Sequence, residues 1–371
     1  MMVLRTAVVG AGVISGQHLT GLRKCPNTTP VGVCDIDEDR ARSMAHDHNT
    51  TAYTDLDELL ETESLDWLHI CTPVQTHESI GLSALKAGVS VLIEKPITVT
   101  ADELTTLRDT AETNDAIVSP VHNHMFDPAT RRARALLDRG IVGDIRGVDV
   151  TYTGASYAHE PNRGAWTFEL PGGEFEEGIP HPLYLALALG GYPADTSAID
   201  IRTALTRAYE QEFSYDSVQL QYQTDHGVLC SVRVQPGGTP VHRIDIHGSA
   251  GSLVIDLVSQ TVVPLTADYT SSTINRARNN LERVGRRLQG TILAVRDVLD
   301  NRINDSWETE IQLNSHFYQI DAEAAALLGD RPQPVPIEQA HWVLSLMEEI
   351  RSVAEDSTVR LEPTPSPDTS V

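Results

Sequence analysis

The sequence predicts an α/β protein of two domains, a doubly wound parallel sheet followed by an α/β domain with a largely antiparallel open sheet. Two observations predict this fold. About the first 120 residues alternate short apolar runs with amphipathic stretches, and strand-like segments follow one another closely later in the chain. Repeated βαβ units give parallel sheets, whereas closely spaced strands pair antiparallel. A chain of 371 residues is long enough for about two domains.

The strands of the first domain are expected where short apolar runs are bounded by turn residues. These runs lie at residues 3–9, 31–34, 67–71, 89–93 and 116–118. Amphipathic stretches lie between them, as expected for helices that cover both faces of a parallel sheet. We assign residues 1–122 to this domain.

The second domain is expected to begin with a helix at residues 129–139 and to end with one at residues 337–354. Strand-like segments separated by Gly or Asp follow the first helix. They lie at residues 145–152, 217–223, 228–234, 243–247 and 252–256. We assign residues 123–361 to this domain, and the polar, proline-rich residues 362–371 to a disordered tail.

The charge of the chain narrows the choice of partners. Asp and Glu number 52 against 28 Lys and Arg, which gives a formal net charge of −24. Long-range repulsion opposes binding to nucleic acid, and no stable membrane association is expected. Many carboxylates with few lysines favour a halophile with a salt-loaded cytoplasm, because salt screens the repulsion.

Two features of the sequence predict a cytoplasmic location. The start of the chain lacks the apolar core of a signal peptide, and no run of 18 apolar residues follows. The cysteines show no CxxC pair and no metal-ligand spacing; they are Cys25, Cys34, Cys71 and Cys230. We expect them to be buried thiols in a reducing compartment, and we expect no zinc site.

The stretch VVGAGVISGQHL carries a dinucleotide-binding fingerprint directly after the first expected strand. Gly10, Gly12 and Gly16 have GxGxxG spacing. Gly10 is expected to make the tight turn, Gly12 to let the backbone approach the pyrophosphate, and Gly16 to allow close helix packing. Val13 and Ile14 open the following helix, whose first N–H groups are expected to hold the phosphates.

Asp35 ends the second expected strand and predicts the choice of cofactor. A carboxylate at this place hydrogen-bonds the adenosine ribose hydroxyls, whereas a 2′-phosphate would be repelled. The neighbouring Asp37 adds to this repulsion. We therefore expect NAD as the cofactor, with NADP disfavoured.

The fifth expected strand runs into Glu94-Lys95-Pro96. With this tripeptide the chain resembles the glucose-fructose oxidoreductase and inositol dehydrogenase (Gfo/Idh/MocA) family. Four more stretches carry the resemblance, in order: GAGVISG, CTPVQTH, FDPA and PGGEFEEGIPH. The resemblance implies an N-terminal Rossmann domain, a C-terminal α/β domain with the substrate between the two, and nicotinamide-dependent oxidation or reduction of a sugar or polyol carbon.

Lys95 is the candidate catalytic base, and it is one of only three lysines, with Lys24 and Lys86. Hydride removal from a carbinol carbon needs a base for the hydroxyl proton. A lysine in a dry cleft can accept that proton, whereas arginine stays protonated. The resemblance implies that Lys95 contacts the substrate hydroxyl and the cofactor ribose, with Glu94 on the cofactor side and Pro96 holding a turn that suits a cis peptide bond.

The segment EGIPHPLY is the second catalytic element that the resemblance implies. The family pattern is Asp-x-Gly-x-His-x-x-Asp, and here Glu177, Ile179, His181 and Tyr184 occupy its four positions. His181 is the candidate proton-transfer group, because imidazole titrates near neutrality, and Glu177 is expected to orient it or the substrate. Tyr184 in place of the last acid is assigned to the substrate side.

Other residues are assigned to the cleft by the same resemblance. On the nicotinamide side they are Thr72, Pro73 and His77, and on the substrate side Asn123, His124, Arg163 and Trp166. Trp166 could stack on a sugar ring or pack in the core, and both alternatives remain open. The spacing of His122 and His124 could suggest a metal, but no third ligand of suitable spacing follows, so no metal is expected.

Three functions are compatible with these features. The favoured one is an NAD-dependent dehydrogenase of a sugar, polyol or nucleotide-linked sugar. A redox-assisted glycosidase would retain NAD through turnover, and a non-catalytic regulator would bind NAD without turnover. We expect a homo-oligomer, a dimer or tetramer, that assembles through the C-terminal sheet.

Residues 275–302 form a basic amphipathic segment. Apolar residues recur there at spacings of three and four, as on one face of a helix. They are Leu281, Val284, Leu288, Ile292, Val295 and Leu299. Seven arginines against three acidic residues give the segment a charge of +4. We expect the stripe to be buried on the second domain or on a sister subunit, and not to lie on a membrane.

Overall fold

The computed structural model describes residues 3–266, residues 314–356 and part of residues 277–296. The chain forms two compact units. The first comprises Met1–Ala135 and Gly285–Leu344, and the second Leu136–Val284 and Ser345–Val371. The first unit therefore includes a late part of the chain, Gly285–Leu344. A division of the chain into two continuous domains at residue 122 would leave that part out of the first domain.

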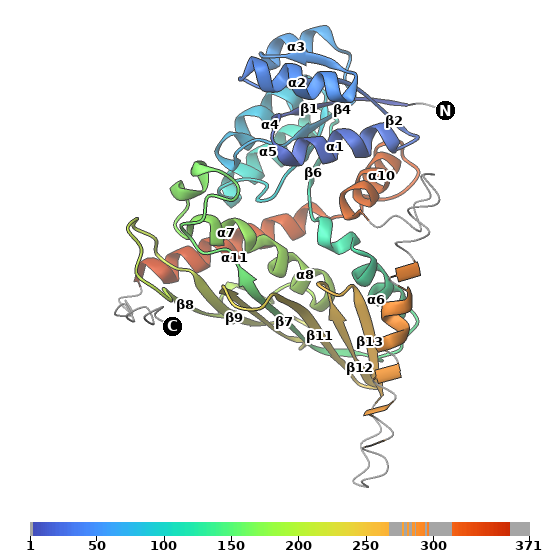
Figure 1. Ribbon diagram of the computed structural model, residues 1–371, viewed down its shortest axis with the longest axis vertical. Helices are drawn as coiled ribbons and strands as arrows, with labels where there is room; N and C mark the ends of the chain where they lie inside the picture. The colour runs from blue at the N-terminus through green and yellow to red at the C-terminus, as the bar shows by residue number, and fades with distance from the viewer. Residues whose placement is uncertain are drawn as a thin grey trace, which may run out of the picture. The chain divides into compact units, whose positions relative to one another are not determined.

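In the described part of the first unit, six strands form a parallel sheet with the order β3-β2-β1-β4-β5-β6 (Figure 1). The strands are β1 (Leu4–Val9), β2 (Thr28–Cys34), β3 (Thr51–Tyr53), β4 (Trp67–Ile70), β5 (Ser90–Ile93) and β6 (Val118–Pro120). The helices between them are α1 (Val13–Lys24), α2 (Glu38–His48), α3 (Leu56–Thr62), α4 (His77–Lys86) and α5 (Ala101–Thr113). The strand order reverses between β1 and β4, and sheets of this kind bind ligands at that point, outside the carboxyl ends of the strands.

The residues before the helices explain where several of them begin. Asp37 and Asp55 accept hydrogen bonds from the first turns of α2 and α3. Thr100 and Glu103 form a capping box at the start of α5. Before α1, by contrast, Gly12 provides no side-chain cap. The N–H groups in the first turn of α1 are therefore not satisfied by a capping side chain.

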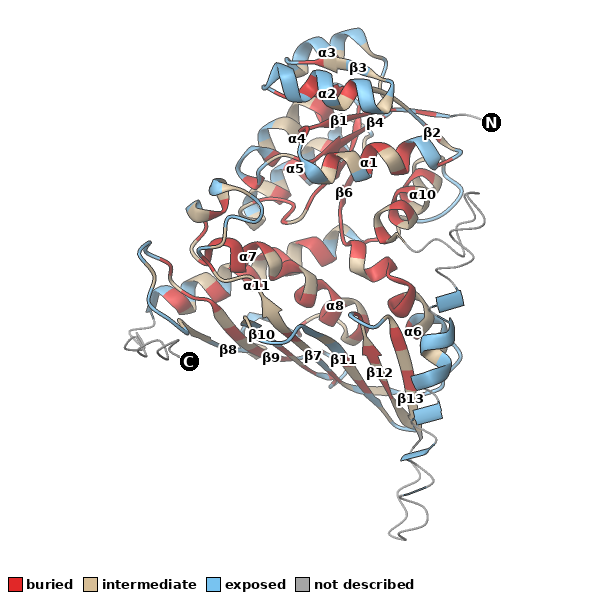
Figure 2. Cartoon of the chain, viewed as in Figure 1, coloured by how far each residue is buried: buried red, intermediate tan, exposed pale blue. Residues whose placement is uncertain are grey.

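Apolar side chains cover both faces of the parallel sheet, as expected for its near-continuous hydrophobic strands. Successive residues of β5 point to opposite faces: Val91 and Ile93 belong to one core cluster, and Leu92 belongs to the other. In β1, Ala7 and Val8 are divided in the same way. Figure 2 shows these strands as buried. The sheet is thus fixed between two helix layers, and its carboxyl edge is a rigid place for functional side chains.

Helix α10 (Ser315–Leu327) packs on α1 within the first unit. A Cβ added to Gly21 of α1 would lie 2.7 Å from Ile320 and 2.9 Å from Phe317, so a glycine is needed for this close approach. Helix α11 (Ile337–Asp356) begins in the first unit, where Ala340 and Leu344 join the core. Ile320 and Ala324 of α10 join the other core cluster, so the two late helices contribute to opposite faces of the parallel sheet.

In the described part of the second unit, seven strands form an open sheet with the order β13-β12-β11-β7-β10-β9-β8. They are β7 (Ile145–Ala155), β8 (Ile199–Ala204), β9 (Ser217–Gln223), β10 (Leu229–Pro236), β11 (Val241–Gly248), β12 (Gly251–Asp256) and β13 (Thr261–Thr266). Neighbouring strands pair antiparallel, except that β7 and β10 pair parallel. The predicted largely antiparallel sheet is confirmed, with this one parallel pair as a difference.

Helix α8 (Pro180–Gly190) covers one face of this sheet, and α7 (Gly173–Gly178) precedes it (Figure 1). A Cβ added to Gly190 would overlap Cys230 Sγ and press on Val148, so α8 lies directly on β10 and β7. On β11 of the same sheet, Arg243 and Asp245 form an ion pair with solvent-accessible side chains. The sheet therefore has an apolar face under the helix and a polar face opposite.

The apolar stripe of residues 275–302 is described only in part. Leu281, Val284, Leu288, Ile292 and Val295 are between 54% and 73% exposed. They lie in the orange segment of Figure 1, which is pale blue in Figure 2. The prediction that the second domain of the same chain buries the stripe is therefore wrong for these residues. Leu299 and the predicted tail at residues 362–371 lie outside the described residues.

Among the helices that the structure describes, none combines the length and the apolar character required to span a lipid bilayer.

Candidate active site

The glycine loop between β1 and α1 has the geometry that the fingerprint predicts. Gly10 has a φ of +94°, and a Cβ there would lie 2.5 Å from the carbonyl oxygen of Cys71. Only glycine fits this position. A Cβ added to Gly12 would meet nothing within 4 Å, and Val13, at the start of α1, is 93% exposed. The loop therefore leaves space for a phosphate group at the N-terminus of α1.

Gly16 does not have the predicted role. A Cβ added there would lie 3.8 Å from His48 and from Met44, which is an ordinary van der Waals distance. Close packing therefore does not require glycine at this position. The glycine that does allow close packing of α1 is Gly21, which faces α10.

Asp35 follows β2 and ties the neighbouring loops together. Its Oδ2 accepts a hydrogen bond of 2.7 Å from the N–H of Ala11 in the glycine loop. Its Oδ1 accepts one of 2.9 Å from the N–H of Asp37 and another of 2.9 Å from the guanidinium of Arg40. Arg40 is absent from the predicted set, and it offsets part of the repulsion that a 2′-phosphate would meet here.

Strand β5 ends at Ile93 and delivers Glu94, Lys95 and Pro96 to the carboxyl edge of the parallel sheet. Glu94 is buried and Lys95 is half-buried. The Lys95–Pro96 peptide bond is cis. The backbone N–H of Lys95 donates a hydrogen bond of 3.2 Å to Glu94 Oε2. The Glu94 side chain therefore contacts the same turn that presents the candidate base.

His77 joins this turn to the CTPVQTH loop. Its Nδ1 lies 3.0 Å from the carbonyl oxygen of Pro96, and its Nε2 lies 2.8 Å from that of Thr72. The side chain is only 1% exposed. The prediction that His77 lines the nicotinamide side is therefore corrected: both ring nitrogens contact backbone carbonyls, and the residue positions two loops. Thr72 is half-buried and Pro73 is exposed, as a lining role requires.

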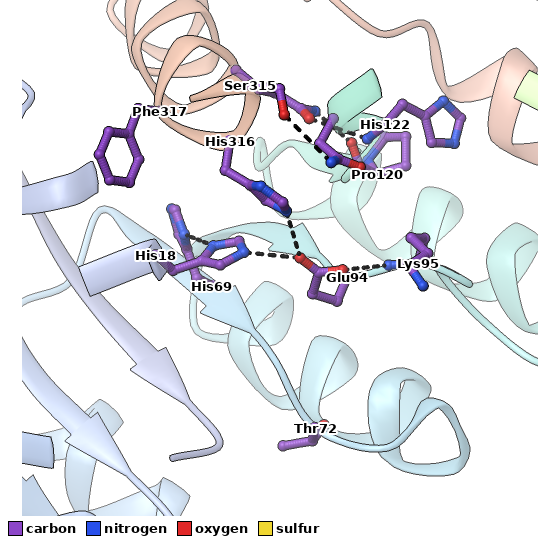
Figure 3. Close-up of polar contacts among 12 residues, drawn as sticks. His18, His69, Thr72, Glu94, Lys95, Pro120, His122, Ser315, His316 and Phe317 are labelled. Atoms are coloured by element: carbon purple, nitrogen blue, oxygen red, sulfur yellow. Dashed lines mark hydrogen bonds and ion pairs between the residues drawn. The ribbon is translucent and has the colours of Figure 1, made fainter. Parts of the chain in front are cut away.

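Two histidines contact the carboxylate of Glu94, and a third contacts one of them (Figure 3). Its Oε1 lies 2.9 Å from His18 Nε2 and 3.6 Å from His316 Nε2. His18 Nδ1 in turn lies 2.8 Å from His69 Nδ1. The residues come from α1, β4, the end of β5 and α10, all in the first unit. The sequence predicted Glu94 on the cofactor side. It did not predict the contacts of its carboxylate with the imidazoles of His18 and His316.

The charge states in this cluster follow from its surroundings. Burial alone raises the pKa of Glu94, but hydrogen bonds from His18 and His316 outweigh burial and hold the pKa well below its usual value. Burial, followed by the charge of His18, lowers the pKa of His69 well below its usual value. Near neutral pH, Glu94 is therefore a carboxylate and His69 a neutral imidazole.

Asn123 and His124 lie in the turn after β6. Asn123 is buried and His124 is half-buried. His124 Nδ1 lies 2.6 Å from Asp127 Oδ2, whereas His122 Nδ1 lies 2.8 Å from Gln339 Oε1. His122 and His124, whose spacing could suggest a metal, therefore have different side-chain partners.

Helix α8 brings His181 and Tyr184 together in the second unit. His181 Nδ1 lies 2.8 Å from the Tyr184 hydroxyl, because residues three apart share one face of a helix. Tyr184 is fully buried and His181 is half-buried. The tyrosine at the position of the family's last acid therefore still gives His181 a hydrogen-bonding partner.

Glu177, Arg163 and Trp166 also lie together in the second unit. Glu177 Oε2 is 3.7 Å from Arg163 Nε, and the Glu177 side chain is only 8% exposed. Trp166 Nε1 donates a hydrogen bond of 3.0 Å to the carbonyl oxygen of Arg163. The Arg163 N–H donates one of 3.2 Å to Glu174, whose pKa is raised by burial. This arrangement can present a cation, a carboxylate and an aromatic edge to a polyhydroxylated ligand.

Two family models match the chain over more than half of its length. The model described as oxidoreductase family, NAD-binding Rossmann fold, matches residues 4–122, and the GFO/IDH/MocA C-terminal domain matches residues 130–254. The chain belongs to the Gfo/Idh/MocA family of oxidoreductases. Its first unit is thus an NAD-binding Rossmann domain, and the predicted fold class, family and cofactor are confirmed.

Curated relatives and solved structures agree with this family assignment. Trans-1,2-dihydrobenzene-1,2-diol dehydrogenase of Sus scrofa is 29% identical over 258 residues, which cover 67% of this chain and 73% of the relative. Inositol 2-dehydrogenase of Rhizobium meliloti is 25% identical over 259 residues, which cover 69% and 76%. The structure of the WlbA dehydrogenase from Bordetella pertussis, in complex with NADH and UDP-GlcNAcA, matches with a TM-score of 0.72 at 18% identity over 96% of both chains. At this identity the structural likeness shows the fold alone.

Several residues of the site lack a sequence signal. His18, His69 and His316 come from three distant segments, so no spacing connects them to Glu94. His69 alone carries a hint, because it interrupts the apolar strand WLHI and must therefore be buried. Arg40 follows Asp35 by five residues on α2, a separation that indicates contact only once the turn between them is known.

Proposed function

We propose that this protein is an NAD-dependent dehydrogenase that transfers a hydride between nicotinamide and a carbinol carbon of a sugar, polyol or nucleotide-linked sugar. The observation that carries this proposal is the position of Lys95. It is half-buried, follows β5 at the carboxyl edge of an NAD-binding sheet, and lies next to a buried carboxylate. The names of the two dehydrogenase relatives, which act on an inositol and on a dihydrodiol, support oxidation of a carbinol carbon.

The chain's own residues account for cofactor binding and proton transfer. When bound, NAD supplies the hydride acceptor. The glycine loop, with Val13 and Ile14 in the first turn of α1, holds the pyrophosphate through backbone N–H groups. Asp35 accepts hydrogen bonds from the ribose hydroxyls. Lys95 Nζ takes the hydroxyl proton as the hydride leaves the same carbon, which completes a two-electron oxidation to a carbonyl.

The residues of the second unit act on the substrate in this proposal. His181 is the second proton-transfer group, and Tyr184 fixes its ring through the hydrogen bond to Nδ1. Glu177 and Arg163 hold substrate hydroxyls or an attached anionic group, because they already form a carboxylate–guanidinium pair. Trp166 lines the substrate side, and so do Asn123 and His124 of the first unit.

One experiment separates the possible functions. The protein is incubated with NAD and a panel of free sugars, inositols and nucleotide-linked sugars in molar salt, while absorbance at 340 nm and the release of reducing sugar are followed. We expect NADH formation with at least one member of the panel. Release of reducing sugar without net NADH would support a glycosidase instead. NAD binding without any turnover across the panel would support a regulator.

We further infer that the protein works in a salt-rich cytoplasm as a dimer or tetramer assembled through the C-terminal sheet. The net charge of −24 supports the salt-rich setting. The exposed apolar residues Leu281, Val284, Leu288, Ile292 and Val295 support self-association. Analytical ultracentrifugation in molar salt should give a dimer or tetramer mass, and a monomer at all concentrations would contradict the inference.

A further inference from the structure

We propose that His18, Glu94 and His316 form a binding site for a divalent transition-metal ion, with Zn²⁺ as the best match. Each residue offers one ligand atom, and these atoms lie within 4.8 Å of one another. Figure 3 shows the two imidazoles directed at the same carboxylate oxygen. The site belongs to the first unit alone and lies beside the turn that presents Lys95.

The distances in the cluster suit a small ion. In a tetrahedral zinc site with bonds of about 2.0–2.1 Å, neighbouring ligand atoms are about 3.3–3.4 Å apart. Glu94 Oε1 lies 2.9 Å from His18 Nε2 and 3.6 Å from His316 Nε2, on either side of that separation. Side-chain shifts that close the remaining separation, which is at most 4.8 Å, would bring all three atoms onto one ion. Two imidazole nitrogens and one carboxylate oxygen are also a ligand set typical of zinc, with a fourth position left for water.

Burial of the cluster adds an electrostatic reason for a cation. The side chains of His18 and Glu94 are only 1% and 10% exposed. A buried carboxylate is costly unless a positive charge or several hydrogen bonds compensate it. With neutral imidazoles the group carries one negative charge, which a divalent ion would reverse. A single protonated imidazole would neutralise the charge without metal, and the experiment below distinguishes these two arrangements.

His69 supports the metal arrangement from behind His18. A metal-bound imidazole usually donates its other ring N–H to a neighbour, which fixes its tautomer and orientation. For coordination through Nε2, His18 would carry its proton on Nδ1, which lies 2.8 Å from His69 Nδ1. His69 is fully buried, and its Nε2 has no hydrogen-bond partner among the described residues. A buried ring nitrogen without a hydrogen-bond partner is unfavourable. The position of His69 is explained if its role is to orient His18 as a metal ligand.

An ion at this site would connect three distant parts of the first unit. His18 lies on α1 directly after the glycine loop, Glu94 precedes the candidate base, and His316 lies on α10. Helices α1 and α10 already meet at Gly21. Metal binding would therefore fix the late helix α10 to the two elements that carry the cofactor loop and Lys95, and it should raise the unfolding temperature.

The test uses the full-length, untagged protein after treatment with EDTA and dialysis. Zn²⁺ is titrated in competition with a chromophoric chelator, and Co²⁺ is used for its visible absorption spectrum. We expect one equivalent to bind, with a tetrahedral Co²⁺ spectrum and a higher unfolding temperature. His316→Gln should weaken binding at least tenfold, and His69→Phe about 10- to 100-fold, as is usual for a residue that orients a ligand.

His247→Gln is the matched control, because His247 also lies near a carboxylate, 3.3 Å from Asp149, but is half exposed. It should bind Zn²⁺ as tightly as the wild type. Circular dichroism checks that His316→Gln is folded, and His18→Gln replaces it if it is not. Absence of stoichiometric binding to the wild type, or equal affinity in wild type and ligand variant, would overturn the proposal in favour of a metal-free ion pair. NAD and substrate are absent from this test, so its outcome is independent of the proposed dehydrogenase activity.

Discussion

The cofactor-binding edge of the first unit and the helical segment of the second unit present their functional side chains in different ways. In the first unit, Asp35 lies one residue and Lys95 two residues after the carboxyl end of a parallel strand, and the topology places these ends at one edge of the sheet. In the second unit, His181 and Tyr184 lie on a helix that covers an antiparallel sheet. The sheet there does not dictate which residues meet. A motif at the end of a parallel strand can therefore be interpreted from the sequence. A motif on the helix of the second unit tolerates substitution when the new residue still contacts the functional side chain, as Tyr184 contacts His181.

Removal of Lys95 should have the largest effect. We expect Lys95→Ala to retain NAD binding and to lose about 10²- to 10⁴-fold in turnover, the usual contribution of general acid–base catalysis. NAD affinity is measured by fluorescence titration, and turnover with the substrate that the panel identifies. Lys86→Ala, a variant of the exposed lysine on α4, is the matched control and should be near wild type. Near wild-type turnover of Lys95→Ala would show that the strand-end position does not carry catalysis.

The His181–Tyr184 pair should show smaller, coupled effects. We expect His181→Ala to lower kcat by about 10²-fold. Tyr184→Phe, which keeps the buried ring, should cost about tenfold, because it removes the hydroxyl that orients the His181 ring. If the tyrosine acts through the histidine, Tyr184→Phe should have little further effect in the His181→Ala background. Multiplicative losses in the double variant would show that the two side chains act independently.

Exchange of the charge after β2 should shift cofactor preference. Asp35→Ser removes a carboxylate, and Ile36→Arg adds a cation at a neighbouring position that is 93% exposed, while Arg40 remains nearby. We expect the ratio of NADP to NAD affinity to rise at least tenfold, measured as dissociation constants. Ile36→Ser, which adds no charge, serves as the control. Tighter binding of NADP than of NAD by the wild type would contradict the proposed role of Asp35.

A buried acid in the first unit should make stability depend on pH. Burial raises the pKa of Glu323 to about 8, against a weaker lowering by hydrogen bonds from Ser119 and Gln319. In the unfolded chain the pKa of this carboxyl is close to the ordinary glutamate value of 4.5. Between these values the folded state holds a proton that the unfolded state has lost, so stability is full below about pH 4.5 and falls as pH rises toward 8, at about 1.4 kcal/mol per pH unit.

Glu323→Gln should remove this dependence. The variant keeps the shape of the side chain and is always neutral, so we expect a higher unfolding temperature than the wild type at pH 8 and a similar one at pH 5. Glu338→Gln, at an exposed position of α11, is the control. An unchanged difference between pH 5 and pH 8 in Glu323→Gln would show that another group is responsible.

Central strands could be predicted from the sequence, whereas three of the four edge strands of the two described sheets could not; β6, predicted at residues 116–118, is the exception. Strand β9 spans Ser217–Gln223, as predicted, and β10, β11 and β12 begin and end within two residues of the predicted bounds. The strands without a prediction are β3, β8 and β13, which all lie at sheet edges. An edge strand is partly exposed, so its apolar pattern is weak. The parallel pairing of β7 with β10 is a matter of topology, which local pattern does not contain.

The candidate site divides in a similar way. The sequence predicts the positions of four site residues, because each lies shortly after the end of a strand that can itself be predicted. They are Gly10, Gly12, Asp35 and Lys95. His77 lies between two backbone carbonyls, and Gly16 is not closely packed. Both features depend on the path of neighbouring loops. The histidines around Glu94 depend on α10, which returns to the first unit from late in the chain. Long-range contacts of this kind leave no mark in residue spacing.

Transfer of an isotope tests the central claim most directly. The panel member that is turned over is prepared with deuterium on the carbon that becomes the carbonyl, and the nicotinamide product is analysed by mass spectrometry. The account predicts one deuterium in NADH for each carbonyl formed, with none released to water, and loss of this transfer in Lys95→Ala. Deuterium that stays in the sugar product, or that appears in water while NAD is unchanged, would contradict a dehydrogenase.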